Sequence, residues 1–152
     1  MKSVRTQLLP TVGLLLLVAI AYLPAMNAGY VWDDERLITL NERVTTSSGL
    51  SDIWTDTRQF DYFPVTLTSF WLEYRVFGDH AAGYHVVNIM LHALGVVMLW
   101  RVLIAMGISN TVAWIAAAGF AVHPVNVASV AWISERKNTL SLLFAAMSVW
   151  CW

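Results

Sequence analysis

The stretch LLPTVGLLLLVAIAYLPAM, residues Leu8–Met26, is uncharged and almost entirely apolar. As an α-helix, about 19 residues rise roughly 28 Å, which is close to the thickness of the hydrocarbon layer of a membrane. A cleaved signal peptide is the alternative, because Lys2 and Arg5 form a basic start and the string MNA resembles a cleavage site. Since the apolar core of a signal peptide usually runs only about 7–15 residues, we expect a retained transmembrane helix.

A dense acidic cluster follows this span almost at once. The string VWDDERL places Asp33 and Asp34 side by side, and nine of the ten acidic residues of the chain lie between Asp33 and Asp79. Either aspartate can cap a short helix that starts near Glu35, where acidic residues are favourable. This part of the chain, residues 27–83, is therefore a polar insert between apolar segments.

The rest of the polar insert is expected to form short amphipathic helices. Ser51 can cap a short helical turn. The string PVTLTSFWLEYRVF starts at Pro64, which suits a first helical turn, and is followed by Gly78, which suits a helix end. About 14 residues are too few to span a membrane, and their many aromatic side chains predict a helix that lies in the membrane interface.

The composition of the whole chain is typical of an integral membrane protein. Of 152 residues, 58% are hydrophobic and 12% are charged, which is about half the charged share of an average soluble domain. Eight residues are tryptophan, a residue that gathers at membrane interfaces. The net charge of −1 gives no basic field that would favour a nucleic-acid partner, and a single cysteine, Cys151, excludes an internal disulfide.

Further apolar segments lie at about residues 84–106, 111–123 and 139–152. We predict an all-α, multi-pass transmembrane helical bundle built from these segments and the first span. The third segment is short for a span, and the last, about 14 residues long, is too short to cross a bilayer. We therefore expect the chain to be the N-terminal part of a longer protein.

Basic residues set the expected orientation of the bundle. Lys2 and Arg5 precede the first span and Arg101 lies near the end of the second, which places the N-terminus and the turn GISN in the cytoplasm. The polar insert and the loop at residues 124–138 then share the extracytoplasmic side. Two cations in that loop oppose the positive-inside rule; an inverted topology is the alternative to a functional reason for their position.

Four strings together resemble one known family. They are YVWDDERLITLN, YFPVTLTSFWLEYRVFG, YHVVNIMLHAL and HPVNVASVAWISERKNTLSLLF. They resemble the membrane half of the transmembrane and tetratricopeptide-repeat (TMTC-like) proteins in their bacterial form, which are grouped with the protein O-mannosyltransferases in the GT-C glycosyltransferase superfamily. The resemblance implies an acidic motif in the first extracytoplasmic loop, further spans, and a tetratricopeptide-repeat (TPR) region, of which the later spans and the repeats are absent from this chain.

The implied activity is transfer of a sugar, mannose, from a polyprenyl-phosphate donor to a serine or threonine hydroxyl of a protein. The expected partners are membrane lipid, the lipid-linked sugar and an acceptor protein, at the extracytoplasmic face of a bacterial inner membrane. Transfer to a hydroxyl needs a base, and adjacent carboxylates raise one another's proton affinity. By resemblance Asp33 is the catalytic residue and Asp34 assists it; the residues alone favour a helix cap and solvated acids.

The second extracytoplasmic loop supplies the other candidate site residues. Arg136 and Lys137 are expected to bind the donor phosphate, because a fixed cation stabilises a departing phosphate. Glu135 is the only acid of this loop, where related enzymes carry a second acidic motif. His123 is either a substrate-site residue or a cap at the membrane interface. A loop held at the lipid headgroups by its cations is the alternative.

Three polar residues of the second span, His85, Asn88 and His92, fall on one helical face. Hydrogen bonds between helices are expected for them, and two histidines without a nearby acid favour no metal site, although the need for a divalent metal stays open.

Trp32 is either an interfacial anchor or a surface that stacks on a sugar. A non-catalytic membrane scaffold is the alternative function, and a transporter is disfavoured because intramembrane charge is scarce.

Overall fold

The computed structural model describes residues 5–58 and 62–152, which are mostly helical and contain no strand. Four helices form the bundle: α1 (Arg5–Tyr22), α6 (Ala81–Ala105), α7 (Asn110–Ala121) and α9 (Arg136–Cys151). The polar insert contains α2 (Asp34–Leu37), α3 (Glu42–Thr45), α4 (Gly49–Thr55) and α5 (Pro64–Phe77). The shorter connecting elements are the 3₁₀ helices η1 (Leu23–Asn27), η2 (Pro124–Asn126) and η3 (Ile133–Glu135), and helix α8 (Val127–Ala131). The predicted all-α fold is confirmed for the described residues.

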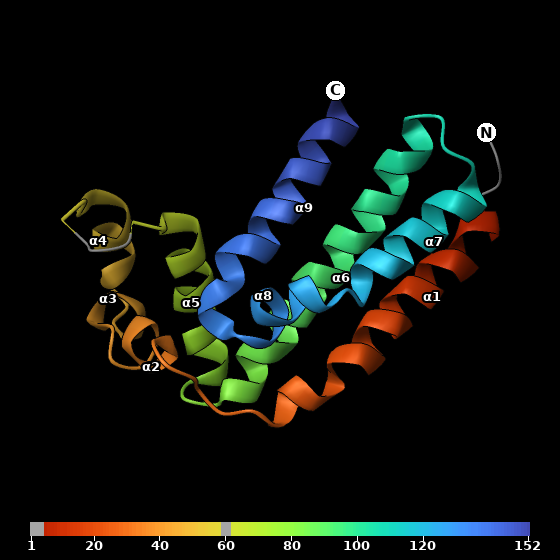
Figure 1. Cartoon of the computed structure of the whole chain (residues 1–152). Helices are drawn as coiled ribbons and strands as arrows, with labels where there is room; N and C mark the ends of the chain where they lie inside the picture. The colour runs from red at the N-terminus through yellow and green to blue at the C-terminus, as the bar shows by residue number, and fades with distance from the viewer. Residues whose placement is uncertain (1–4, 59–61) are drawn as a thin grey trace.

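The helices are arranged so that both polar loops meet at one end. Figure 1 shows α1, α6 and α7 side by side, with α9 beside α6 and the polar insert next to the first turns of α9. The start of α1, the α6–α7 turn and the end of α9 lie at the opposite end of the bundle. Residues far apart in the sequence, in the insert and in the loop before α9, are thereby brought together.

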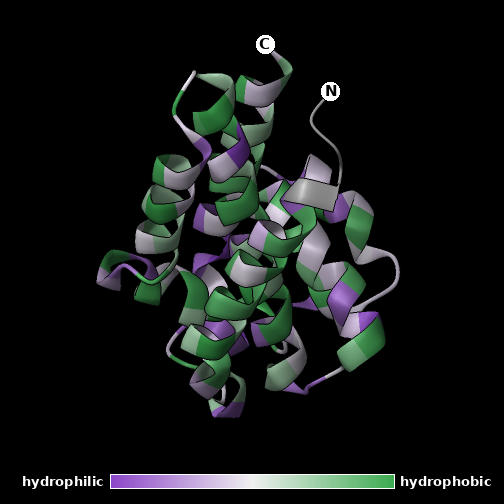
Figure 2. Ribbon diagram, turned by 90° about the vertical axis from the view of Figure 1, so that its right-hand side faces the viewer, coloured by the Kyte–Doolittle hydropathy of each residue, from purple (hydrophilic) through white to green (hydrophobic). Residues whose placement is uncertain are grey.

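Two helical segments, Gln7–Asn27 and Ala81–Ala105, are long and apolar enough to cross a membrane, which agrees with the first two predicted spans. Figure 2 shows hydrophobic residues spread around the long helices, as expected for helices that face lipid. The third predicted span forms α7, which is followed after a bend of 49° by the segment Pro124–Ala131. Pro124 lacks the backbone N–H that would donate to the Phe120 carbonyl and continue α7. The side-chain amide of Asn126 donates to that carbonyl instead, at 2.6 Å.

Two expected boundaries were wrong. α9 begins at Arg136 rather than near residue 139, so three residues of the predicted loop 124–138 form its first turn. α4 begins at Gly49, with Ser48 rather than Ser51 at its N-cap. Gly49 is required there because a Cβ at this position would lie 2.1 Å from the Arg43 carbonyl oxygen.

Small residues allow the bundle helices to approach closely. Ala113, Ala117 and Ala121 repeat every fourth residue along α7, and all three are fully buried in the core shared with α1 and α6. On α6, a Cβ at Gly95 would lie 2.9 Å from the Leu142 side chain of α9. Such small residues let helix backbones pack tightly where lipid gives no hydrophobic drive for association.

The polar insert has a core of its own. Apolar side chains of the loop before α3, of α3, α4, α5, α6 and η3 form it, namely Ile38, Val44, Ile53, Leu67, Phe70, Tyr84 and Ile133. α5 has the predicted bounds, and Gly78 ends it with a φ of 55°, a conformation that favours glycine. This second core joins the insert to the bundle and positions the loop before α2 against η3.

Candidate functional site

The two adjacent aspartates lie against the 3₁₀ helix η3, about a hundred residues later in the chain. The Asp34 carboxylate is buried; its Oδ1 accepts the backbone N–H of Ser134 at 2.8 Å and also contacts the Ser134 hydroxyl. The same hydroxyl donates to Asp33 Oδ1 at 2.9 Å. The structure therefore joins the predicted acidic motif to the Ser-Glu-Arg-Lys segment through Ser134.

The two aspartates have different surroundings. Asp34 Oδ2 accepts the backbone N–H of Val31 at 2.9 Å, so both carboxylate oxygens of Asp34 are engaged inside the protein. Asp33 is only partly buried and lines a cavity of about 800 Å³ between the short helices of the insert. Asp33 is thus the carboxylate that faces the cavity, whereas Asp34 fixes the local backbone.

Trp32 is presented to solvent by a strained turn. Its φ is 53°, a left-handed conformation that is unfavourable for a bulky residue. The turn is closed by Asp34, whose N–H donates to the Val31 carbonyl at 3.1 Å while its carboxylate accepts the Val31 N–H. The Trp32 indole is 86% exposed and meets the Trp132 ring edge-on at a centroid distance of 5.2 Å. An aromatic surface therefore stands directly beside Asp33.

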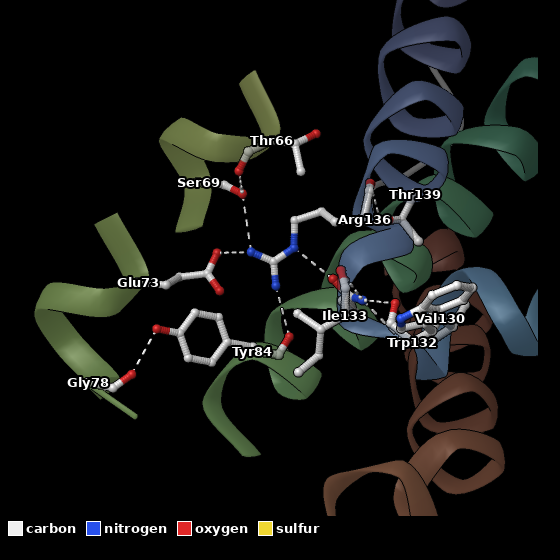
Figure 3. A network of polar contacts seen from close by, with 11 residues as sticks. Thr66, Ser69, Glu73, Gly78, Tyr84, Val130, Trp132, Ile133, Arg136 and Thr139 are labelled. Atoms are coloured by element: carbon white, nitrogen blue, oxygen red, sulfur yellow. Dashed lines mark hydrogen bonds and ion pairs between the residues drawn. The ribbon is translucent and has the colours of Figure 1, made fainter. Parts of the chain in front are cut away.

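Arg136 lies inside the protein rather than on the loop surface that a phosphate-binding role requires. Its guanidinium is fully buried and forms an ion pair with Glu73 of α5. Nε donates to Asn88 Oδ1 at 2.7 Å, and the Nη atoms donate to the Tyr84 carbonyl at 2.9 Å and to the Ser69 hydroxyl at 3.1 Å. Figure 3 shows the guanidinium among side chains from α5 and α6. Arg136 thus ties three helices together.

The polar face of α6 makes the expected hydrogen bonds to other elements. The Asn88 amide nitrogen donates to the Trp132 carbonyl at 3.1 Å, close to the carbonyls of Val130 and Ile133. A ring nitrogen of His92 lies 3.0 Å from the Ala121 carbonyl, and a ring nitrogen of His85 lies 3.4 Å from the Gly29 carbonyl. Asn88 therefore holds the backbone just before Ser134, while Arg136 holds the backbone just after it.

Lys137, next to Arg136, lies at the protein surface. Its Nζ pairs with Glu135 Oε1 at 2.7 Å and lies 5.5 Å from the centroid of the Phe63 ring. The Lys137 side chain is 35% exposed and lines a cavity of about 260 Å³ whose other walls are mostly apolar, including Phe63, Leu140 and Phe144. A cation at the edge of an apolar hollow is complementary to a ligand with a negatively charged head and an apolar tail.

His123 lies at the junction of α7 and η2. It is exposed, and its Nδ1 accepts the backbone N–H of Val125 at 3.2 Å, which is a capping contact. Among the described residues there is no group of three or more His, Cys, Asp or Glu side chains that could hold a metal ion.

Burial changes the proton affinity of two groups near the site. It raises the pKa of Glu73 to about 7, and the charge of Arg136 acts in the opposite direction. Burial, followed by the negative charges of Asp79 and Asp34, raises the pKa of Tyr30 to about 12. Tyr30 therefore remains a neutral phenol beside the aspartates at physiological pH.

Sequence reasoning missed Ser134 and Glu73. Ser134 directly precedes the charged residues Glu135, Arg136 and Lys137, but a serine gives no local signal that it contacts two distant carboxylates. Glu73 is an isolated acid within the aromatic helix α5. An isolated acid in such a helix indicates a buried partner, because an unpaired buried charge is costly, and this signal could have found it.

Comparison with known proteins identifies relatives of this chain. It is similar to a protein O-mannosyl-transferase of Caenorhabditis elegans (31% identical, covering 88% of this chain and 22% of that protein). It is also similar to the protein O-mannosyl-transferases Tmtc1 of Drosophila melanogaster (34%, covering 82% and 16%) and TMTC4 of Homo sapiens (29%, covering 85% and 21%). The chain spans about a fifth of the length of these relatives. No family model and no solved structure matches it. The similarities support a TMTC-like family for this chain.

Proposed function

We propose that this chain forms part of a membrane glycosyltransferase that transfers a sugar, mannose, from a polyprenyl phosphate to a serine or threonine hydroxyl of a protein. The reaction would take place at the extracytoplasmic side of the membrane. The observation that carries the proposal is the contact between Asp33, Asp34 and Ser134, which joins the two polar loops at one end of the bundle. The names of the relatives, protein O-mannosyl-transferases, support the same activity.

In the proposed reaction Asp33 is the general base. It takes the proton of the acceptor hydroxyl as the oxygen attacks the sugar carbon, and the bond from that carbon to the phosphate oxygen breaks. Asp34 stays in place as the group that holds the turn, because both of its oxygens accept backbone N–H groups. Ser134 fixes the orientation of the Asp33 carboxylate through its hydroxyl.

The donor is proposed to lie on the Lys137 side of the site. The apolar walls contributed by Phe63, Leu140 and Phe144 suit a prenyl chain, and Lys137 is the cation at their edge. A preorganised cation in a water-poor site stabilises the charge that develops on a leaving phosphate. Arg136, in contrast, would act indirectly, by holding the first turn of α9 from which Lys137 projects.

The experiment is a transfer assay with the full-length protein in membranes, a polyprenyl-phosphate sugar and an acceptor protein. Asp33→Asn should reduce transfer about 10²- to 10⁴-fold, the range associated with loss of a general base. Glu35→Gln, which neutralises an exposed carboxylate two residues away, is the matched control and should retain activity. Undiminished transfer by Asp33→Asn would remove this residue from the mechanism. Absence of transfer by the unmodified protein would favour the scaffold alternative.

A further inference from the structure

The cavity that Asp33 lines is a second potential binding site, distinct from the hollow beside Lys137. It measures about 800 Å³ and lies between α2, α3 and α4, a size within the range of cavities that bind ligands, about 300–1,000 Å³. Its walls carry many polar and charged side chains, including Arg36, Asn41, Glu42 and Asp52. Such walls are unsuited to a prenyl chain and suited to a hydrated polypeptide.

The charges around this cavity are unequal. Among the described residues, its lining carries the carboxylates of Asp33, Glu42, Asp52 and Asp56 and the guanidiniums of Arg36 and Arg43. Arg43 pairs with Asp56 at 2.7 Å, and Arg58 from just outside the lining also contacts Asp56, at 3.1 Å. Even with Arg58 included, the lining and its border therefore carry an excess of negative charge.

We propose that this cavity binds the acceptor as an extended peptide with basic residues beside the target hydroxyl. The inference rests on the proposed function, because Asp33 at the cavity wall is where the acceptor hydroxyl must arrive. An extended chain advances about 3.3 Å per residue, so a peptide of several residues that lies in this cavity would bring residues near that hydroxyl within reach of Glu42 of α3 and Asp52 of α4, which line the same cavity. Both carboxylates are exposed and can meet a lysine or arginine without disturbance of the fold.

The test measures peptide binding directly and does not need catalysis. Two fluorescently labelled peptides with the same serine-containing centre, one flanked by lysines and one by glutamates, are titrated with the full-length protein in detergent while anisotropy is recorded. The lysine-flanked peptide should bind about 3- to 10-fold more tightly at low ionic strength, and the difference should shrink in high salt, because surface charges are screened.

Two variants assign the preference to this cavity. Glu42→Gln combined with Asp52→Asn should abolish the difference between the peptides, and Glu42→Lys combined with Asp52→Lys should reverse it. Asp79→Asn, which removes an exposed carboxylate outside the lining, is the control and should keep it. Equal binding of both peptides by the unmodified protein, or a preference that survives in the Gln/Asn variant, would overturn the inference.

The same two peptides also distinguish a failure of this inference from a failure of the proposed function. Selective binding of the lysine-flanked peptide without sugar transfer would support the cavity assignment and contradict the glycosyltransferase. Sugar transfer to both peptides with equal KM would support the glycosyltransferase and contradict the cavity assignment.

Discussion

The buried pair Arg136–Glu73 allows a quantitative test of how the site is supported. Both side chains are buried, and the guanidinium also bonds to Asn88 and to the Tyr84 carbonyl. Removing one member of a buried ion pair typically costs about 3–5 kcal/mol, because the other charge is left without a partner. We therefore expect Arg136→Met and Glu73→Leu each to lower the free energy of unfolding by about that amount.

The double variant should cost much less than the sum of the two single variants. Apolar side chains of similar volume can replace a buried ion pair with little loss, so the remaining cost comes from Asn88 Oδ1 and the Tyr84 carbonyl, which lose their donors. An unsatisfied buried acceptor costs about 1–3 kcal/mol. The two single variants sum to about 6–10 kcal/mol, so a coupling energy of several kcal/mol is expected.

The assay is thermal unfolding in detergent, followed by tryptophan fluorescence. At about 2–4 °C per kcal/mol, each single variant should unfold roughly 6–20 °C below the unmodified protein. Arg58→Met is the control, because the Arg58 side chain is 91% exposed, and it should unfold at an unchanged temperature. Additive losses in the double variant would refute the idea that the two residues act as a pair.

The pH dependence of the same pair follows from the pKa of Glu73, which burial raises to about 7. Because the folded-state pKa lies above the unfolded value of about 4.3, the folded protein binds the extra proton between these values. Stability should therefore rise as the pH falls from about 7 toward 4.3, and Glu73→Gln should lose that dependence. The coupling energy is best measured at pH 8, where the carboxylate is ionised.

The remaining predictions concern Ser134 and Gly95. Ser134→Ala keeps the N–H that Asp34 accepts but loses the hydroxyl that contacts both carboxylates; transfer should fall about tenfold or more at a nearly unchanged unfolding temperature, and Ser134→Thr should restore part of it. A loss confined to stability, or no rescue by threonine, would contradict this orienting role. Gly95→Ala should destabilise the protein by about 1–3 kcal/mol in thermal unfolding, because the new Cβ would meet Leu142 at 2.9 Å. Gly119→Ala, whose Cβ would meet no atom within 4 Å apart from its chain neighbours and the backbone of its own helix, is the matched control and should not destabilise.

Local features of the sequence were sufficient to predict helices whose boundaries depend on their own residues. The first span follows from the length of one uncharged run, and α5 has its predicted bounds because Pro64 starts it and Gly78 ends it in a left-handed conformation. α9 begins earlier than predicted. Basic residues are unfavourable in the first turn of a helix; here Arg136 is accommodated by Glu73 and Asn88 on two other helices, and Lys137 is accommodated by Glu135.

In the candidate site, too, the sequence indicates features that depend on neighbouring residues but not contacts between residues far apart in the chain. The aspartate pair could be singled out from its own string, and the resemblance assigned the leading role to Asp33. The difference between the two carboxylates depends on Ser134, about a hundred residues away, whose N–H and hydroxyl reach Asp34 and Asp33. Nothing in the spacing of residues within either loop indicates that contact.

The neighbouring cations Arg136 and Lys137 show why two adjacent residues can have different roles, one structural and one proposed to bind the donor. Successive residues of an α-helix point about 100° apart, so when one side chain of the first turn of α9 faces α5 and α6, the next points away from them. Arg136 takes the inward position, where its planar fork of donors bonds to a carboxylate, an amide and a carbonyl at once. Lys137 takes the outward position beside Phe63. The buried arginine thereby fixes the helix turn from which the lysine projects, three residues after the serine that contacts Asp33.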